Sequence, residues 1–283
     1  MARLVRIDAE LVRRGLARSR QHAAELLAAG HVLLDGQVVT KPARQVDPAQ
    51  AVRVDTPSLD DYVSRGAHKL AGALDALGPA APVVTGRRCL DAGASTGGFT
   101  DVLLRRGAEH VVAVDVGYGQ LAWTLQSDPR VTVLDRTNVR TLEPEQVAPA
   151  PEVVVGDMSF ISLTLVLPAL SRCAAPAADL LLMVKPQFEV GKERLGHGGV
   201  VRDTALHEES VLNVAAAAAQ LGLDTWAVVP SPLPGPSGNV EYFVALRREH
   251  PRALRGQALA DAVADAVRTG PAGRSHEPEG EGP

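Results

Sequence analysis

The sequence contains few cysteines, no histidine pair that could bind a metal and no long apolar run. Its two cysteines, Cys89 and Cys173, are too few for a disulfide framework or a four-cysteine zinc site. None of the eight histidines lies at metal-ligand spacing from another, so we expect no metal centre. No segment approaches the roughly 18 apolar residues of a membrane helix, and charged residues stand where a signal peptide needs an apolar run. We therefore expect a cytoplasmic protein that does not span a membrane.

Lysine is scarce as well. Of the 29 basic residues only four are lysines, and the other 25 are arginines. Arginine stays protonated in proteins, whereas the compact lysine amine can lose its proton. Each lysine is therefore either a chance survivor or a candidate for chemistry, and the four are Lys41, Lys69, Lys185 and Lys192.

The charge of the chain is unevenly distributed. A net charge of −4 argues against a nonspecific nucleic-acid coat. Residues 1–22, however, carry six arginines against Asp8 and Glu10, a local charge of +4. We expect four of these arginines to contact phosphates, with a solvated charged face as the alternative. The four are Arg3, Arg6, Arg18 and Arg20.

Residues 1–60 have the pattern of a small α+β unit. Apolar residues at helical spacing predict two short helices, the first ended by Gly15 and the second capped by Ser19. Asp35-Gly36 lies between two apolar runs and predicts a hairpin. We interpret residues 55–60 as a linker.

From residue 61 onwards, strand patterns alternate with helix patterns, which is typical of a parallel sheet covered by helices on both faces. Ser64 can cap the first of these helices, which Gly78 closes. The seven predicted strands are Cys89–Gly93, His110–Val116, Val131–Asp135, Val153–Asp157, Leu180–Lys185, Thr225–Val229 and Glu241–Leu246.

The end of the chain differs from this α/β region, which we place at residues 61–248. Residues 253–268 predict an amphipathic helix, and residues 269–283 contain too few apolar residues to fold. We therefore treat residues 249–283 as a terminal helix with a disordered tail.

The first predicted strand runs into a glycine-rich turn, which lets backbone amides approach a ligand closely. Ser95 stands where a dinucleotide-binding turn has its middle glycine. Asp115 follows Gly93 by 22 residues, where a carboxylate can bind ribose hydroxyls. An adenosine cofactor such as S-adenosylmethionine fits this pattern, and a plain β–α loop is the alternative. The predicted cofactor-binding residues are Asp91, Gly93, Ser95, Thr96, Gly97, Gly98, Phe99 and Asp115.

Charged residues stand at the ends of three predicted strands. Asp157 and Lys185 end the fourth and fifth strands, and ligands of open α/β sheets bind at that edge. Glu241 begins the last strand and joins them if this strand is antiparallel. Lys69, on the helix before the first strand, could complete the group. Solvent exposure would explain isolated charges, but the apolar runs before Asp157 and Lys185 favour partial burial.

Six of the nine aromatic residues lie in or beside these motifs. Core packing is the default interpretation for each, although some could wall a pocket or stack a base. Residues 187–203 contain four glycines and mixed charge, so they form either a flap over substrate or an ordinary surface loop. The six aromatic residues are Phe99, Tyr118, Phe160, Phe188, Tyr242 and Phe243.

Five strings together carry a family resemblance. They are Ser64-Arg-Gly-Ala-His-Lys69-Leu, Asp91-Ala-Gly-Ala-Ser-Thr-Gly-Gly-Phe-Thr, Gly156-Asp157-Met-Ser-Phe-Ile, Val184-Lys185-Pro-Gln-Phe-Glu and Gly238-Asn-Val-Glu241-Tyr. Over nearly the whole chain the sequence resembles the TlyA, or haemolysin A, family of ribosomal RNA 2′-O-ribose methyltransferases.

This resemblance implies a fold and a reaction. The implied fold is a Rossmann-like methyltransferase with a seven-stranded, mostly parallel sheet whose last strand is antiparallel. An α+β RNA-binding domain of the ribosomal-protein-S-four type precedes it. The implied donor is S-adenosylmethionine, and the implied targets are cytidines in 16S and 23S ribosomal RNA of both subunits. The family's catalytic Lys-Asp-Lys-Glu tetrad falls on Lys69, Asp157, Lys185 and Glu241.

The mechanism that follows from this tetrad has two forms. A ribose hydroxyl must be aligned with the methyl group and must lose its proton. Lys185 could accept that proton only as a neutral amine, which burial and Lys69 favour, whereas Asp157 and Glu241 favour the ammonium form. Lys185 is therefore either the base or a charge that orients the hydroxyl.

Three other functions compete with this one. A base methyltransferase is the first, but amino methylation usually goes with an Asn-Pro-Pro-Tyr-like string where this chain has Asp157-Met-Ser-Phe160, and carbon-five methylation needs a cysteine at the sheet edge. A membrane-active haemolysin is the second, although the helix at 253–268 would be a poor anchor. The third is a binding module without catalysis, against which the complete tetrad argues.

Overall fold

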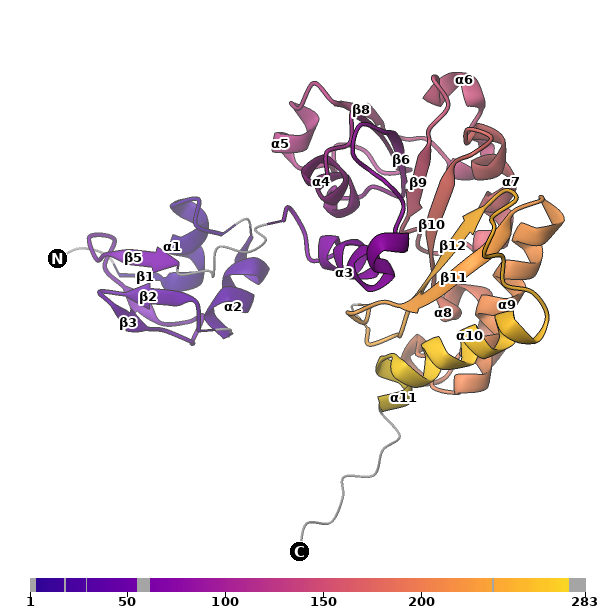
Figure 1. Ribbon diagram of the computed structural model, residues 1–283. Helices are drawn as coiled ribbons and strands as arrows, with labels where there is room; N and C mark the ends of the chain where they lie inside the picture. The colour runs from indigo at the N-terminus through magenta and orange to yellow at the C-terminus, as the bar shows by residue number, and fades with distance from the viewer. Residues whose placement is uncertain (1–3, 18, 29, 55–61, 236, 275–283) are drawn as a thin grey trace, which may run out of the picture. The chain divides into compact units, whose positions relative to one another are not determined.

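The computed structural model describes residues 4–17, 19–28, 30–54, 62–235 and 237–274. The chain divides into two compact units, residues 1–61 and residues 62–283. Figure 1 shows the helices and strands of each unit.

The described part of the first unit contains two helices and five short strands. The predicted hairpin is present, with Asp35 and Gly36 at φ of 51° and 83°, and the Ser19 hydroxyl caps the second helix by accepting the N–H of His22 at 3.1 Å. The pairing of β1 with β4 was not predicted, because two-residue strands show no period. The elements are β1 (Val5–Arg6), α1 (Ile7–Arg13), α2 (Arg20–Ala28), β2 (Val32–Leu34), β3 (Gln37–Val38), β4 (Gln45–Val46) and β5 (Val52–Val54).

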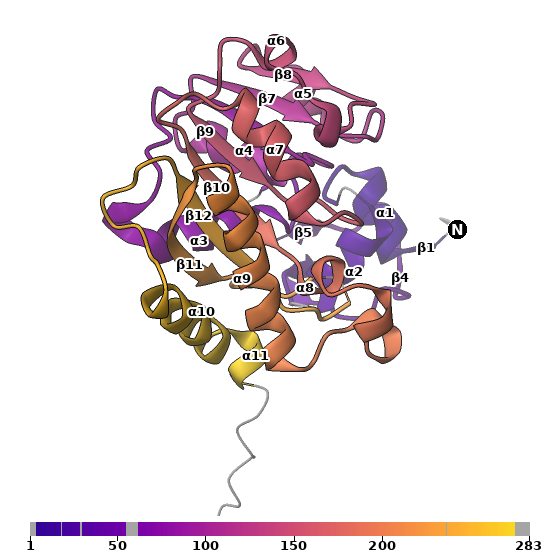
Figure 2. The same ribbon diagram turned by 90° about the vertical axis from the view of Figure 1, so that its right-hand side faces the viewer.

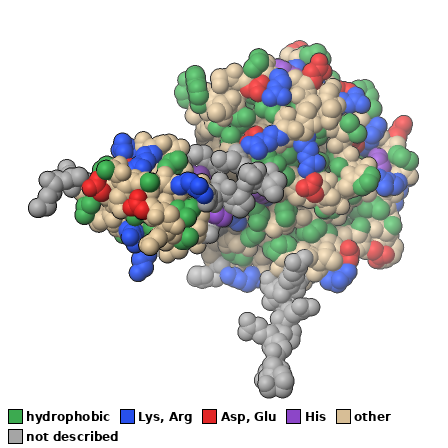
Figure 3. All heavy atoms as spheres, turned by 60° about the vertical axis from the view of Figure 1, so that its left-hand side comes forward, with side chains coloured by type: hydrophobic (Ala, Val, Ile, Leu, Met, Phe, Trp, Pro, Cys, Tyr) green, Lys and Arg blue, Asp and Glu red, His purple; other side chains and the backbone are tan. Residues whose placement is uncertain are grey.

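The core of this first unit is small and aliphatic. Ile7, Leu11 and Leu27 are fully buried and pack with residues of the short strands. Lys and Arg side chains lie along the edges of this unit, with Asp and Glu side chains between them (Figure 3).

The second unit is built on a seven-stranded sheet in the order β11-β12-β10-β9-β6-β7-β8. All seven predicted strands are present. The sheet is parallel except for β12, which is antiparallel to both of its neighbours. The strands are β6 (Arg88–Ala92), β7 (His110–Val114), β8 (Val131–Leu134), β9 (Val153–Gly156), β10 (Asp179–Val184), β11 (Asp224–Pro230) and β12 (Tyr242–Arg247).

Helices cover both faces of this sheet and bury two separate apolar cores. One face packs against α3 (Ala67–Leu77), α4 (Gly98–Arg105) and α5 (Trp123–Gln126). The other face packs against α6 (Pro144–Val147), α7 (Leu163–Cys173), α9 (Thr204–Gln220) and α10 (Gln257–Thr269). In Figure 2 the helices α7, α9 and α10 lie in front of the sheet. Together with α8 (Pro186–Glu189), which follows β10, they form a three-layer α/β/α unit.

Two local predictions are wrong, and a third is displaced. Ser64 does not cap α3, because a turn intervenes and the helix begins at Ala67 with Gly66 at its N-cap. The segment after residue 269 folds in part, since a short helix α11 (Pro271–Arg274) follows α10; residues 275–283 lie outside the described residues. The last long helix starts at Gln257, four positions later than predicted, because Gly256 turns the chain at φ of 52°.

None of the helices in the described ranges is both long enough and apolar enough to cross a bilayer.

Candidate active site

The sheet topology brings three predicted residues to one edge. Strands β9 and β10 are parallel, with Gly156 beside Leu182, so Asp157 and Lys185 emerge from the same edge. Strand β12 runs the opposite way and pairs Tyr242 with Val184. Glu241, which precedes β12, therefore starts where Lys185 ends, as the antiparallel arrangement requires.

Lys69 reaches this edge from helix α3. The helix passes so close to the connection between β11 and β12 that a Cβ on Gly72 would lie 2.6 Å from the Pro232 side chain. Lys69 Nζ donates to Glu241 Oε2 at 2.5 Å. The two side chains are 8% and 1% exposed, so this is a buried ion pair.

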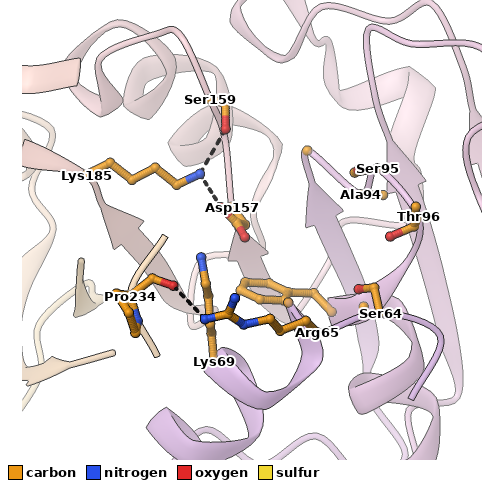
Figure 4. Close-up of a pocket in the computed structure, with 14 residues that line it drawn as sticks. Ser64, Arg65, Lys69, Ala94, Ser95, Thr96, Asp157, Ser159, Lys185 and Pro234 are labelled. Atoms are coloured by element: carbon orange, nitrogen blue, oxygen red, sulfur yellow. Dashed lines mark hydrogen bonds and ion pairs between the residues drawn. The ribbon is translucent and has the colours of Figure 1, made fainter. Parts of the chain in front are cut away.

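A second ion pair lies beside the first. Lys185 Nζ is 2.5 Å from Asp157 Oδ1 and donates to Ser159 Oγ at 2.9 Å (Figure 4). Burial raises the pKa of the Glu241 carboxyl above its ordinary value, while Lys69 and Lys185 lower it and Asp157 raises it further. All four charges are therefore within electrostatic reach of one another.

The glycine-rich turn between β6 and α4 closes one side of the site. Gly93 has a φ of 86°, and a Cβ there would lie 2.9 Å from the Asp157 carbonyl oxygen, so only glycine fits. Five of the predicted cofactor residues line a cavity of about 330 Å³ that also contains Lys69, Asp157 and Lys185. The five are Gly93, Ser95, Thr96, Gly98 and Phe99.

Two predicted cofactor residues lie behind this surface. Gly97 faces the core, where a Cβ would meet the side chains of Leu121 and Leu125. Asp91 is fully buried, and its Oδ2 accepts the Thr100 hydroxyl at 2.7 Å. Its Oδ1 has no hydrogen-bond partner among the described residues. Burial raises the pKa of Asp91 to about 7, with the Thr100 hydrogen bond opposing the shift.

Asp115, the last predicted cofactor residue, is held by the backbone. Its oxygens accept the N–H groups of Ser95 at 2.8 Å and Gly117 at 2.7 Å. It lines a second cavity of about 470 Å³, a volume typical of small-molecule sites. The apolar residues of that cavity are Val116, Val139, Met158, Phe160, Ile161 and Val166.

A third and larger cavity, of about 1060 Å³, opens on the other side of Lys185. Lys185 and Glu241 line it together with Phe160 and Phe188. Ser159 borders all three cavities, so they meet at the Lys185–Ser159 contact.

The aromatic residues divide into core and surface groups. Phe160 is 90% exposed, adopts a left-handed φ of 65°, and lies with its ring centroid 5.2 Å from that of Phe188. Tyr118 is also exposed and lies under the Arg136 guanidinium. Core packing accounts for the others, since Phe99 stacks on Phe243 and Tyr242 is fully buried.

The segment 187–203 forms one wall of the large cavity. Its glycines Gly191, Gly198 and Gly199 line the cavity. The end of the segment is anchored, because Asn239 Oδ1 accepts the Val201 N–H at 3.0 Å and His207 Nε2 contacts the Val201 carbonyl at 2.9 Å.

The arginines predicted to bind RNA are described in part. Arg6 and Arg20 both contact Asp8, at 2.9 and 3.0 Å, and remain 45% and 60% exposed. Arg3 and the side chain of Arg18 lie outside the described residues. A buried carboxylate thus holds two guanidinium groups at the surface of the first unit.

Sequence reasoning missed three residues of the site. Arg65 lines the smallest of the three cavities and donates to the Pro234 carbonyl at 3.4 Å. Ser159 is the partner of Lys185, and Glu189 binds the start of α7. All three lie inside the motif strings, which is the only signal that could have identified them.

Two families match the two units. Residues 62–248 match the family described as FtsJ-like methyltransferase, and residues 5–52 match the S4 domain. The chain is 60% identical, over 96% of its length and 100% of the relative, to the 16S/23S rRNA (cytidine-2′-O)-methyltransferase TlyA of Mycobacterium tuberculosis.

Two further similarities cover most of the chain. It is 41% identical, over 85% of each chain, to the putative rRNA methyltransferase YqxC of Bacillus subtilis. A solved structure, a putative hemolysin from Streptococcus thermophilus, is 35% identical and superposes with a TM-score of 0.72 over 95% of this chain and 97% of that one.

Proposed function

The chain belongs to the TlyA family of FtsJ-like methyltransferases, and from this premise we propose that it methylates the 2′-hydroxyl of cytidines in 16S and 23S ribosomal RNA with S-adenosylmethionine. One observation supports the proposal most directly. Two ion pairs, the buried Lys69–Glu241 pair and the partly exposed Lys185–Asp157 pair, stand between a cavity of nucleoside size and a larger cavity with exposed aromatic rings.

The residues present fit S-adenosylmethionine. Asp115 keeps free lone pairs for the ribose hydroxyls, and the apolar wall beside it suits an adenine ring. The turn at Gly93 lies against the Asp157 backbone, where a Cβ would clash, and it lines the cavity of about 330 Å³ that can take the methionine portion. When bound, the cofactor supplies an electrophilic methyl group.

Lys185 acts in this proposal as the charged group that orients the 2′-hydroxyl. Lys185 Nζ forms an ion pair with Asp157 Oδ1 at 2.5 Å. Ser159 holds the same nitrogen from a second direction, so the amine has a defined position. The hydroxyl loses its proton as the O–C bond forms, and Asp157 and Glu241 are the acceptors that the site offers.

The larger cavity receives the target nucleotide in this proposal. Phe160 and Phe188 present aromatic surface on which an unstacked base can stack. Arg6 and Arg20 of the first unit contact phosphates of the folded RNA. The match of residues 5–52 to the S4 domain supports an RNA-binding role for that unit.

Base methylation is supported less well by the same structure. Cys89 lies in the first half of β6, away from the carboxyl edge, and burial raises the pKa of its thiol to about 12. Cys173 ends helix α7 and is buried. Neither thiol is placed to attack a pyrimidine ring.

A nucleoside digest tests the proposal. The protein is incubated with labelled S-adenosylmethionine and, in separate reactions, with naked ribosomal RNA, small subunits, large subunits and whole ribosomes. We expect label in 2′-O-methylcytidine. Label in a methylated base would support the rival enzyme, and absence of label from every substrate would contradict the proposal.

A further inference from the structure

Glu189 is a polar residue of the motif strings that the proposed reaction does not use. Its Oε2 accepts the Ser162 hydroxyl at 2.5 Å, and its Oε1 accepts the Leu163 N–H at 2.8 Å. Both oxygens are therefore engaged at the first residues of α7. Glu189 itself ends α8, so its side chain joins two loops that lie 26 positions apart in the sequence.

The same two loops are joined a second time at the sheet edge. Lys185 contacts Asp157 and Ser159 where both loops leave their strands. Phe160 follows directly after this contact, and the Glu189 contacts begin two residues later, at Ser162. Phe160 is thus bracketed by one clamp on each side along the chain.

The backbone conformation of Phe160 requires stabilisation by neighbouring contacts. A φ of 65° is strained for a bulky residue. Burial of the ring does not compensate, since the side chain is 90% exposed. Such a conformation persists only where the surroundings determine it, and the described contacts around Phe160 are the two clamps and the ring of Phe188.

We infer that Glu189 is a positioning residue that holds Phe160 at the mouth of the large cavity for stacking on the target base. This inference rests on the proposed function. An ordinary stabilising contact at the start of α7 is the competing account, and the two differ in one respect. If Glu189 acts by positioning Phe160, its removal changes the methylation of RNA only when the Phe160 ring is present.

The experiment is a double-mutant cycle between Glu189→Ala and Phe160→Ala in the full chain, with RNA methylation and cofactor affinity as readouts. We expect Glu189→Ala to raise KM for RNA about 10-fold, since small misplacements near a reacting group have effects of this order or larger. Cofactor affinity should change less than KM for RNA does, although Phe160 also lines the cavity of Asp115. In the Phe160→Ala background the same substitution should have no further effect.

Two further variants serve as a rescue and a control for this cycle. Glu189→Gln retains an acceptor for Leu163 and gains a donor for Ser162, so it should restore wild-type KM. Glu143→Ala is the matched control, because Glu143 also stands at a helix start and binds α7 through Arg172, away from the cavity. If Glu189→Ala does not fold, Ser162→Ala replaces it in the cycle.

Equal losses in both backgrounds, an unchanged KM, or a parallel loss of cofactor affinity would overturn the inference. Wild-type protein without methylation activity would instead contradict the proposed function, so the two failures are distinguishable.

Discussion

Buried carboxylates behave differently in the two units. In the first unit, Asp8 and Glu10 are 4% and 1% exposed. Hydrogen bonds from Arg6 to Asp8 and from Arg13 to Glu10 are the largest contributions that lower the pKa of each acid to about 2. In the second unit, burial outweighs every compensating contact and raises the pKa of Asp91 to about 7. The pKa values of Glu189 and Glu241 are raised for the same reason.

This difference in pKa indicates a different role for each group of acids. Asp8 and Glu10 of the first unit pair with Arg6, Arg20 and Arg13, whose side chains are 45%, 60% and 64% exposed, which suits contact with phosphates. Three buried acids of the second unit, Asp91, Glu189 and Glu241, have raised pKa values despite their contacts. Such groups cluster at functional sites, because a substrate or cofactor completes their interactions.

The largest effect is expected for substitution of Lys185 in the second unit. Lys185→Met keeps much of the length of the side chain but removes the charge that faces Asp157 and the 2′-hydroxyl. We expect methylation to fall about 10²-fold or more, because misplacing the reacting hydroxyl has effects of this order. Cofactor affinity, measured by titration calorimetry, should stay within about twofold, because Lys185 lies at the junction with the large cavity.

Lys41→Met is the matched control for this substitution, since Lys41 is an exposed lysine of the first unit. Turnover by Lys185→Met within about tenfold of wild type would remove Lys185 from the reaction. The ion pairs of the second unit would then have no greater role in catalysis than those of the first unit.

Much of this arrangement could be predicted from strand ends. Asp157, Lys185 and Asp115 each follow an apolar run, and the carboxyl ends of parallel strands share one edge, so their convergence needs no side-chain detail. Which lysine pairs with which carboxylate could not be predicted in this way. It depends on how closely α3 approaches, which the small residue Gly72 permits.

The remaining misses have a common physical origin. Sequence analysis identifies Asp8 and Glu10 only as charged residues. In the structure both are buried among arginines, because helix α1 turns them inward. Glu189 and Ser159 act through contacts 26 residues away in the chain. Long-range polar contacts of this kind leave no periodic pattern, whereas apolar faces do.

The next largest effect is on stability and its dependence on pH. Because the pKa of Asp91 is about 7 in the folded chain and 3.8 unfolded, the folded state binds more protons in between. Its stability should therefore fall as pH rises from about 4 to about 7. A difference of about 3 units corresponds to about 4 kcal/mol as an order of magnitude.

Asp91→Asn should remove this loss, so that the variant gains on wild type across that window. Urea unfolding followed by tryptophan fluorescence measures it, because both tryptophans, Trp123 and Trp226, belong to the second unit. Asp8→Asn should leave the same window unchanged, since the pKa of Asp8 is lowered and its contribution is lost only below about pH 4. A parallel curve for wild type and Asp91→Asn would show that burial does not dominate at Asp91.

The smallest effect is expected at the surface of the first unit and decides whether its arginines bind RNA. Arg20→Glu places a negative charge beside Asp8 where a guanidinium stood. If Arg20 contacts a phosphate, affinity for ribosomal subunits should fall about 10-fold at low salt, and the slope of log K against log salt should decrease by about 1. Arg268→Glu is the control, because Arg268 is an exposed, ion-paired arginine of helix α10 in the second unit. Equal affinities and slopes for wild type and Arg20→Glu would leave the solvated-face account, and the compensated acids of the first unit would then serve folding alone.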